Sequence, residues 1–382
     1  MSVLLRFCHP GMLKLLSVGV RARNWYRGQL PEHRRADQHR SRFYEGIWRD
    51  AANRLGASVE QLEKDLLEIR LGWACTRTRQ TTTAIDDPVI LFAAANKPLV
   101  HRLSTKRGLK TPKYFEFTLS SIAQAVAFTR RFGGEWVVKP ANGASGRGVT
   151  TSVLTSFDLV RAAVAAAAYD SNLLVEEQVE GDLYRLLYLD GRLLDAVLRK
   201  SPSVAADGRS SVRKLVRLEN QSRLEAESKF GQALLSIDLD MRRTLSKQGL
   251  SLSSVPKKGS VVTLKRVVNE NSVADNVSAT KLLCKSIIED GAAAAAAVGV
   301  RLAGVDIVTR DPQVPLAESG GVILEVNTTP GYHYHYHQRD GGVAVAIPIL
   351  ARLLLEQPNG DEVLMDSRHA EIPEVVMRAG QQ

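Results

Sequence analysis

The stretch VVKPANGASGRGV, residues 137–149, carries the strongest information about the fold. An apolar run ends in Lys139, and Gly143, Gly146 and Gly148 follow closely. Glycine lets the backbone approach a phosphate, so that consecutive amide N–H groups can point at its oxygens. Lys139 can add a positive charge at the same place. A flexible surface turn has the same composition, so this stretch needs support from elsewhere in the chain.

Two familiar phosphate-binding patterns do not describe this stretch. No Lys-Ser or Lys-Thr pair follows the last glycine, as a P-loop requires. The glycine order is reversed relative to G-x-G-x-x-G, and a strand over 149–153 follows where that motif needs a helix. The pattern instead predicts a glycine-rich hairpin between this strand and a buried strand over 135–139.

A second polar group lies near the C-terminus, in two strands predicted from apolar runs. Glu325 and Asn327 are two residues apart in VILEVN, so both side chains project from one face. Asp306, in GVDIVTR, lies one loop upstream. Two carboxylates and an amide oxygen suit Mg²⁺, which is often shared with phosphates. The alternative is that they are solvated strand residues, but apolar neighbours on both sides indicate buried strands, where an unpaired carboxylate is costly.

Periodicity divides the rest of the chain into short helices and strands. Helices are predicted over 43–55, 59–67, 122–131, 158–169 and 350–355, in a segment ending at Lys106, and from Ala292. Further strands are predicted over 66–72, 74–82, 173–179 and 182–191, the last turning at Asp190-Gly191 into 193–199. Residues 201–280 are polar and resemble an elaborated lid or insertion.

The net charge of +10 is concentrated near the N-terminus. Residues 1–42 hold nine Lys or Arg and two Asp or Glu, whereas the remainder is nearly balanced. A nucleic-acid enzyme usually carries basic stripes over its folded body, so no nucleic-acid partner is expected. We interpret the leader as a solvated, partly disordered arm; an arm for an anionic partner is the alternative.

Cysteine usage and hydropathy indicate a cytoplasmic protein. Cys8, Cys75 and Cys284 are far apart and odd in number, which argues against a disulfide scaffold and suits a reducing compartment. No stretch approaches the roughly 18 apolar residues that a membrane span needs. We therefore expect no transmembrane segment.

Together, and in this order, the motifs resemble those of the ATP-grasp family, and within it the ATP-grasp half of cyanophycin synthetase. The resemblance runs from about Asp87 to His337 and includes AANKPLVHRLSTKRGLKTP, VVKPANGASGRGV, VEEQVEGDLYRLL, ADGRSSV, LAGVDIVT and GGVILEVNTTPG. It implies an α/β (α+β) fold that clamps a nucleotide between two lobes. The implied parts are a basic arm (1–42), a pre-ATP-grasp lobe (43–112), the ATP-grasp unit (113–355, hinge near 175–182, lid at 201–280) and a polar tail (356–382).

The resemblance also assigns site residues by position. It implies that ATP phosphates are bound by Lys97 and Lys139 and covered by a loop containing Asn142, Gly143, Ser145, Gly146, Arg147 and Gly148. It implies an adenine hinge at Glu176, Glu177, Gln178 and Val179, and two Mg²⁺ ions (or Mn²⁺) on Asp306, Glu325 and Asn327. Arg199 and Arg266 fall where the family places basic residues near the transferred phosphate or the substrate carboxylate, and Arg185 is a further candidate.

Three departures from the family pattern qualify these roles. Leu183 replaces an acidic residue after the hinge, so the ribose contact would shift to Asp182. Val273 and Ala274 replace a glycine pair, which puts the substrate-side loop in doubt. The Mur-ligase-like half of cyanophycin synthetase is not in this sequence, so we do not expect the chain to make that polymer by the two-site route.

The implied activity is an ADP-forming carboxylate–amine ligase that activates an amino acid or short peptide as an acyl phosphate. Alternatives are an ATP-grasp kinase, a non-catalytic nucleotide-binding partner in a biosynthetic complex, and a ligase acting on a protein- or nucleic-acid-bound tail recruited by the basic leader. Related enzymes often form homodimers or homotetramers. His333, His335 and His337 would share one face if extended, as zinc ligands do, but the family places a substrate-shaping loop there.

Overall fold

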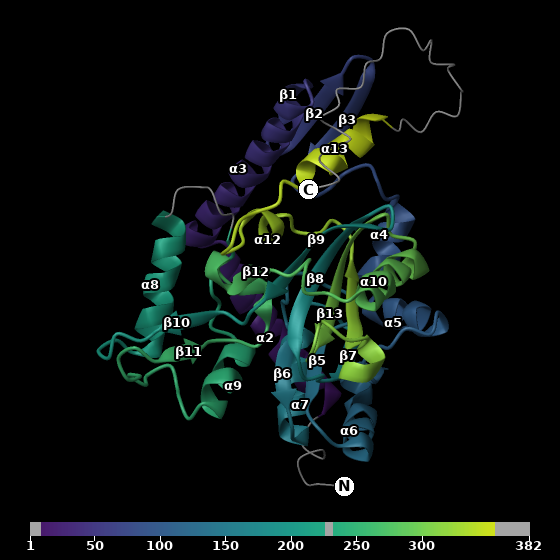
Figure 1. Cartoon of the computed structure of the whole chain (residues 1–382). Helices are drawn as coiled ribbons and strands as arrows, with labels where there is room; N and C mark the ends of the chain where they lie inside the picture. Colours follow the sequence, from purple (N-terminus) through teal and green to yellow (C-terminus); the bar gives the residue numbers. More distant parts are fainter. Residues whose placement is uncertain (1–8, 226–231, 356–382) are drawn as a thin grey trace.

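The computed structural model describes residues 9–225 and 232–355, shown in Figure 1. The helices are α2 (Pro10–Gly28), α3 (Pro31–Arg54), α4 (Pro88–Ala95), α5 (Lys97–Lys106), α6 (Ile122–Phe132), α7 (Ser156–Ala166), α8 (Val212–Glu225), α9 (Leu239–Lys247), α10 (Lys285–Val298), α11 (Leu316–Ser319), α12 (His333–Tyr336) and α13 (Ala346–Leu355). The strands are β1 (Ser58–Glu63), β2 (Leu66–Leu71), β3 (Ala74–Arg79), β4 (Tyr114–Phe117), β5 (Trp136–Pro140), β6 (Thr150–Val153), β7 (Leu173–Glu177), β8 (Asp182–Leu189), β9 (Arg192–Arg199), β10 (Ser203–Ala205), β11 (Val261–Thr263), β12 (Asn276–Ser278), β13 (Leu302–Thr309) and β14 (Val322–Asn327).

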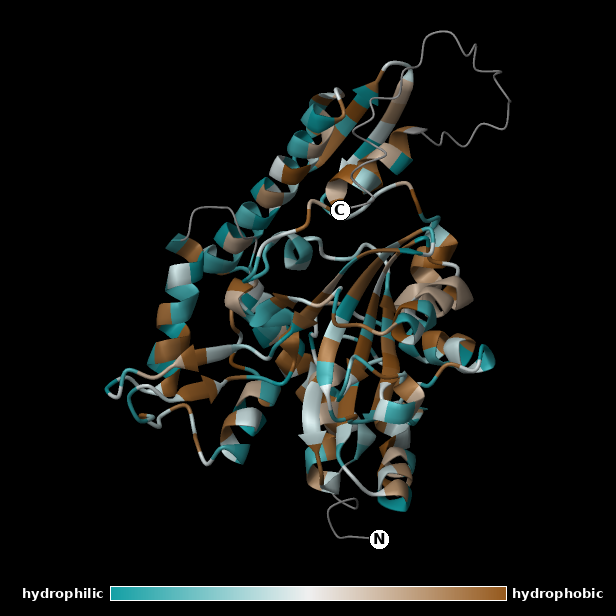
Figure 2. Cartoon of the chain, viewed as in Figure 1, coloured by the Kyte–Doolittle hydropathy of each residue, from teal (hydrophilic) through white to brown (hydrophobic). Residues whose placement is uncertain are grey.

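Two antiparallel sheets form the body of the molecule. One has the strand order β4-β7-β5-β6 and the other β12-β9-β8-β13-β14. Helices α6 and α7 share a buried core with the first sheet, and α5 and α10 cover the second. Most strands of both sheets carry hydrophobic residues interrupted by polar ones (Figure 2), and the hydrophobic residues pack under the covering helices.

A third sheet, β1-β2-β3, packs against α3 and α13. The helix predicted over 59–67 is wrong, because this segment forms β1 and the start of β2, joined at Lys64 and Asp65. Its apolar spacing fits either a helix or a strand. Cross-strand pairing decides the outcome, and Asp65 turns the chain with a left-handed φ of 67°.

The basic leader is helical in its described part, which corrects the expectation of a partly disordered arm. Helix α3 continues through the expected boundary at residue 42. Helix α2 packs on α7, with Leu13 buried in the core of the first sheet. The Arg21 Nε donates to the Ala168 carbonyl at 3.0 Å, which satisfies a free carbonyl beyond the end of α7. Burial of one apolar face therefore orders a segment that its charge alone marks as solvated.

The polar segment expected as a lid or insertion forms a small lobe beside the two main sheets (Figure 1). It contains the two-stranded sheet β10-β11 and helices α8 and α9, which share a core that includes Val212, Met241 and Leu264. The tail expected over 356–382 lies outside the described residues.

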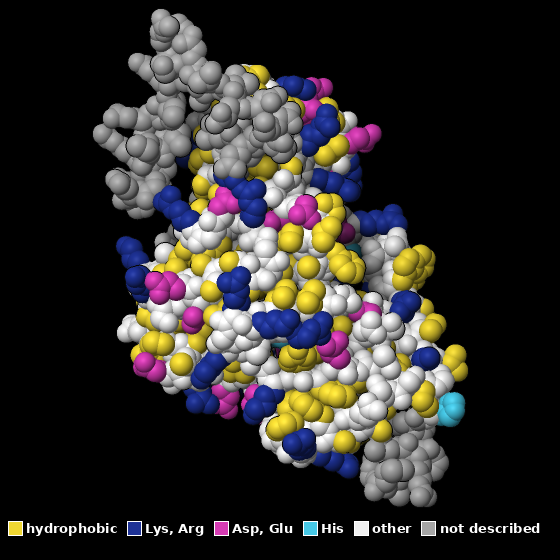
Figure 3. All heavy atoms as spheres, turned by 90° about the vertical axis from the view of Figure 1, so that its right-hand side faces the viewer, with side chains coloured by type: hydrophobic (Ala, Val, Ile, Leu, Met, Phe, Trp, Pro, Cys, Tyr) yellow, Lys and Arg dark blue, Asp and Glu magenta, His cyan; other side chains and the backbone are white. Residues whose placement is uncertain are grey.

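One face of the molecule carries α4, α5 and α10. Its surface combines charged and hydrophobic side chains. Figure 3 shows basic side chains scattered among acidic and hydrophobic ones on this face. Val89 and Phe92 of α4 are 74% and 76% exposed. Within the described ranges, no helix combines the length and hydrophobicity needed to cross a bilayer.

Candidate active site

A cavity of about 2360 Å³ opens between the two main sheets, the insertion lobe and the N-terminal helices. The residues assigned by resemblance line it with one exception. They are Lys97, Lys139, Gly143, Ser145, Gly146, Arg147, Gly148, Glu176, Glu177, Gln178, Val179, Asp182, Arg185, Arg199, Arg266, Asp306, Glu325 and Asn327. The exception is Asn142, whose backbone N–H and side-chain amide both donate to Asp170 at 2.9 Å. Asn142 therefore fixes the base of the loop instead of facing the cavity.

The glycine-rich loop adopts a backbone that few other residues tolerate. Ser145, Gly146 and Gly148 have φ values of 60°, 65° and 75°, in the left-handed region. A Cβ on Gly146 would lie 2.6 Å from side-chain atoms of Asn269 and Val267. The loop thus lies directly on the insertion segment, and glycine is required for this close approach.

Two lysines and two glutamates form a charge cluster beneath the loop, in which Lys139 and Glu176 are buried and the other two are partly exposed. The Lys139 Nζ lies 2.6 Å from Glu176 Oε1 and 3.3 Å from Glu325 Oε1. The Lys97 Nζ donates to the Gly143 carbonyl at 2.7 Å and lies 3.7 Å from Glu325. Burial acts to raise the pKa of Glu325, but the charges of Lys97, Lys139 and Arg185 lower it to about 2. Burial acts to lower the pKa of Lys139, but the carboxylates of Glu176 and Glu325 raise it above its usual value, so the cluster holds this ammonium group at the cavity with its charge intact.

The expected adenine hinge joins β7 to β8 and is held by both neighbouring sheets. The Glu176 side chain is directed at Lys139 and at His101, 3.2 Å away, so it belongs to the charge cluster. The Gln178 backbone N–H donates to the Glu135 carbonyl at 2.9 Å. A Cβ on Gly181 would lie 2.5 Å from the Thr309 carbonyl group, so the crossing point of the hinge requires glycine.

Asp306 and Glu325 lie side by side on two adjacent strands, as expected from the sequence. Asp306 of β13 lies opposite Glu325 of β14. Arg185 donates to both Asp306 oxygens, at 2.6 and 2.7 Å, and the Asn327 amide donates to Asp306 at 3.3 Å. No cluster of three or more His, Cys, Asp or Glu suited to a metal occurs in the described part of the chain. Two carboxylates and one amide oxygen suit Mg²⁺ that takes its other ligands from phosphates and water.

The two other candidate arginines differ in their surroundings. Arg199 is 2% exposed, stacks 3.8 Å from the Tyr334 ring centroid, and donates to Asn269 Oδ1 at 3.0 Å. Its Nε and Nη1 are buried without a hydrogen-bond partner among the described residues, and desolvation lowers its pKa. Arg266 also lines the cavity, but it contacts Ser152 at 3.5 Å and Glu135 at 3.8 Å. Arg199 is thus the guanidinium that a buried anion would satisfy.

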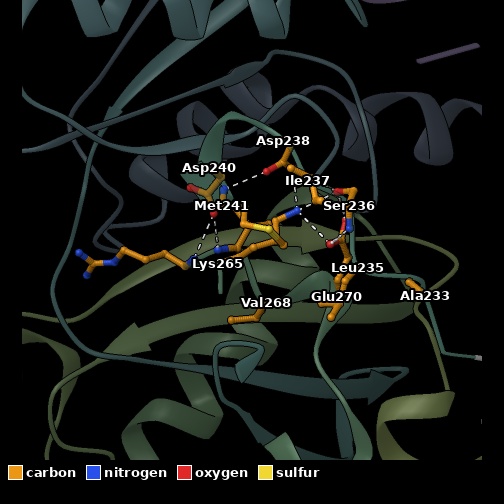
Figure 4. Close-up of polar contacts among 12 residues, drawn as sticks. Ala233, Leu235, Ser236, Ile237, Asp238, Asp240, Met241, Lys265, Val268 and Glu270 are labelled. Carbon is orange, nitrogen blue, oxygen red and sulfur yellow. Dashed lines mark hydrogen bonds and ion pairs between the residues drawn. The ribbon is translucent and has the colours of Figure 1, made fainter. Parts of the chain in front are cut away.

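Sequence reasoning did not find the polar network inside the insertion lobe (Figure 4). The buried Lys265 Nζ lies 2.6 Å from Asp238 and 3.0 Å from Glu270. Asp240 accepts from the N–H groups of Arg266 and Val267, at 3.1 and 3.2 Å. The network fixes the segment that carries Asn269, the partner of Arg199. The sequence hints at this network only through the acidic pair Asp238 and Asp240 in a polar segment. Lys265 and Arg266, which they bind, lie 27 and 26 positions further along the chain.

The histidine run is not extended, so the proposed zinc geometry is wrong. It forms the helical turn α12, in which residues two apart do not share a face, so His335 is directed away from His333. His333 Nδ1 lies 3.1 Å from the Tyr44 hydroxyl, and His335 Nδ1 lies 2.8 Å from Asp195. The ring of His337 packs against Phe43 at 5.0 Å between centroids. The run anchors the loop that follows β14.

Comparisons with known proteins agree with this architecture. No protein-family model matches the chain. The cyanophycin synthetase of Trichormus variabilis is 29% identical over 304 residues, covering 75% of this chain and 33% of that protein. The glutathione biosynthesis bifunctional protein GshAB of Streptococcus agalactiae is 27% identical over 282 residues, covering 72% of this chain and 37% of that protein. The crystal structure of a bifunctional glutathione synthetase from Pasteurella multocida matches with a TM-score of 0.50 and 23% identity, covering 79% of this chain and 42% of that one.

A glycine-rich loop and an acidic strand pair face one cavity between two α+β lobes, which is the ATP-grasp architecture of the matching glutathione synthetase structure. The expected α+β ATP-grasp fold is confirmed. The proteins to which the chain is similar in sequence include cyanophycin synthetases and GshAB proteins. The chain spans about a third of the length of these relatives.

Proposed function

We propose that the chain is an ADP-forming carboxylate–amine ligase that uses ATP and Mg²⁺ to make an amide bond between amino-acid or short-peptide substrates. The observation that carries the proposal is Arg199, a buried guanidinium with two unsatisfied nitrogens in the cavity that also holds Lys97 and Lys139. An isolated buried charge is costly. An anionic ligand, such as a phosphate or a carboxylate, would satisfy it.

The charges of the cavity suit a triphosphate. Lys97 and Lys139 would bind its oxygens under the glycine-rich loop, while the hinge after Glu176 and the carboxylate of Asp182 would face the nucleoside. Asp306, Glu325 and Asn327 would hold Mg²⁺, which neutralises charge on the phosphates and orients them. Burial alone would raise the pKa of Glu325, but its cationic neighbours outweigh this effect and lower the pKa to about 2. Glu325 is therefore ionised at neutral pH.

The chemistry then needs positioned charges and no protein nucleophile. A substrate carboxylate oxygen attacks the γ-phosphorus of ATP, the bond to the β-phosphate oxygen breaks, and ADP leaves. The resulting acyl phosphate is attacked by an amine, which forms a tetrahedral intermediate; inorganic phosphate leaves, and the amine loses a proton. Arg199 would stabilise negative charge in both steps. We also propose a cytoplasmic location, since this reaction requires ATP.

The test is an ADP-release screen with pairs of carboxylic acids and amines, with mass detection of the product. We expect ADP release that depends on both substrates, with a product mass equal to their sum minus one water. A phosphorylated product that forms equally well without the amine would establish a kinase instead. No nucleotide binding at millimolar Mg²⁺ would refute the proposal.

A further inference from the structure

Arginine 40 lies in the segment that the sequence marked only as a basic leader, yet it faces the cavity. It lies one helical turn before Tyr44 on α3, and both residues line the cavity. Tyr44 is 3% exposed, and its hydroxyl lies 3.1 Å from His333 Nδ1. Residues four apart share a helix face, so Arg40 is directed at the loop after β14.

The helix that carries Arg40 is held firmly in place. The Trp48 indole N–H donates to the Gln80 carbonyl at 2.8 Å, and its ring packs edge-on against Tyr332 at 5.8 Å. Both rings are almost fully buried. Arg40 is therefore presented by a rigid element and not by a mobile arm.

Arg40 and Arg199 leave positive charge uncompensated at this end of the cavity. In the described ranges, no carboxylate lies within ion-pair distance of either guanidinium, whereas Arg185 is neutralised by Asp306. The Nε of Arg40 is buried without a hydrogen-bond partner in the same part of the structure, as are two nitrogens of Arg199. Burial, Arg40 and then Arg199 hold the pKa of His333 well below its usual value, so both arginines lie near one neutral imidazole.

Two guanidiniums near one another repel unless anions lie between them. The proposed reaction places one anion, the reacting carboxylate or its phosphate, at Arg199. Arg40 comes from a different element and would remain unsatisfied in that complex. Guanidinium groups match carboxylates with paired N–H donors.

We propose that the acid substrate carries two carboxylates, and that Arg40 binds the one that does not react. This inference rests on the proposed ligase function and deepens it. Arg40 is a specificity-determining residue for a dicarboxylic substrate, such as an acidic amino acid or a short peptide that ends in one. Its arrival from helix α3 makes the N-terminal segment part of the substrate site.

The first experiment measures binding and does not depend on turnover. Aspartate, glutamate and short peptides that end in them are titrated calorimetrically into the full chain, with Mg²⁺ and a non-hydrolysable ATP analogue present. Each acid is compared with its amide, in which one carboxylate is replaced. We expect at least one acid to bind more than tenfold tighter than its amide, and no such preference in the panel would overturn the proposal.

The variant Arg40→Ala should weaken binding of that acid about 10- to 100-fold and leave binding of its amide within about twofold. Arg40→Lys should recover part of the loss. The control Arg35→Ala removes an exposed arginine from the same helix outside the cavity and should behave as wild type. Equal weakening of acid and amide by Arg40→Ala, or no weakening, would show that Arg40 does not read the second carboxylate.

Turnover separates failure of this inference from failure of the proposed function. Amide formation without an Arg40-dependent preference for dicarboxylates would overturn the subsite and leave the ligase function standing. Arg40-dependent binding without ADP release or amide formation, for any amine, would support the subsite and refute the ligase function.

Discussion

The substitution Glu325→Gln tests the charge cluster most directly, because it keeps the shape of the side chain and removes its charge. In the structure, Glu325 lies 3.3 Å from Lys139 and 3.7 Å from Lys97. Lys139 keeps a second partner, Glu176, at 2.6 Å, whereas Lys97 loses its nearest carboxylate. We expect turnover to fall at least about 100-fold, since charge that holds the metal and orients the phosphates is lost.

The stability effect can be worked out from the pKa of Glu325. A fall from the ordinary value near 4.5 to about 2 corresponds to at most roughly 3 kcal/mol of interaction in favour of the ionised form. A depressed folded-state pKa contributes stability above the unfolded value, and this contribution is lost as pH falls through the folded value. The ligand-free variant should therefore unfold more easily than wild type at pH 7, and the difference should shrink between about pH 4.5 and pH 2.

Two assays test the catalytic role of Glu325 and its contribution to stability. ADP release measures turnover, and denaturant unfolding of the ligand-free chain at several pH values measures stability. Glu318→Gln is the control, because Glu318 is exposed on α11 and does not line the cavity. Turnover within about threefold of wild type would refute the role of Glu325, and a stability difference that stays constant from pH 7 to pH 2 would refute the electrostatic account.

Two further substitutions test the hinge and the buried arginine. Gly181→Ala places a Cβ 2.5 Å from the Thr309 carbonyl group, so the free energy of unfolding should fall by a few kcal/mol, as measured in denaturant; Gly46→Ala, in open space on a helix, should be neutral or slightly stabilising. A Gly181 variant as stable as wild type would contradict the close approach. Arg199→Lys keeps the charge but loses the planar contact with Asn269, and kcat/KM for the acid should fall about 100-fold in the ADP-release assay while the KM for ATP changes less; a fall confined to the ATP parameters would move Arg199 to the nucleotide side.

Most predictions that depend on residues close together in the sequence succeeded, whereas two failed where contacts with another segment decided the outcome. The acidic strands and the strand that ends in Lys139 are short apolar runs, which predict buried strands, and these elements formed as expected. The segment 59–67 has a pattern that fits two periods, and its pairing with a neighbouring strand made it a strand. Asn142 was assigned to the cavity by its place in a motif, but a nearby acceptor, Asp170, turned it away.

Outside residues 59–67, the sequence by itself determined most of the short strands and turns, and which polar residues share a strand face, because these properties depend on neighbouring residues. Only the tertiary structure decided that Arg40 faces the cavity, that Lys139 pairs with Glu176, and that the insertion lobe supplies the partner of Arg199. Each of these contacts joins residues far apart in the chain. They depend on how the amphipathic helices bury their apolar faces, which brings charged groups together only after the core has formed.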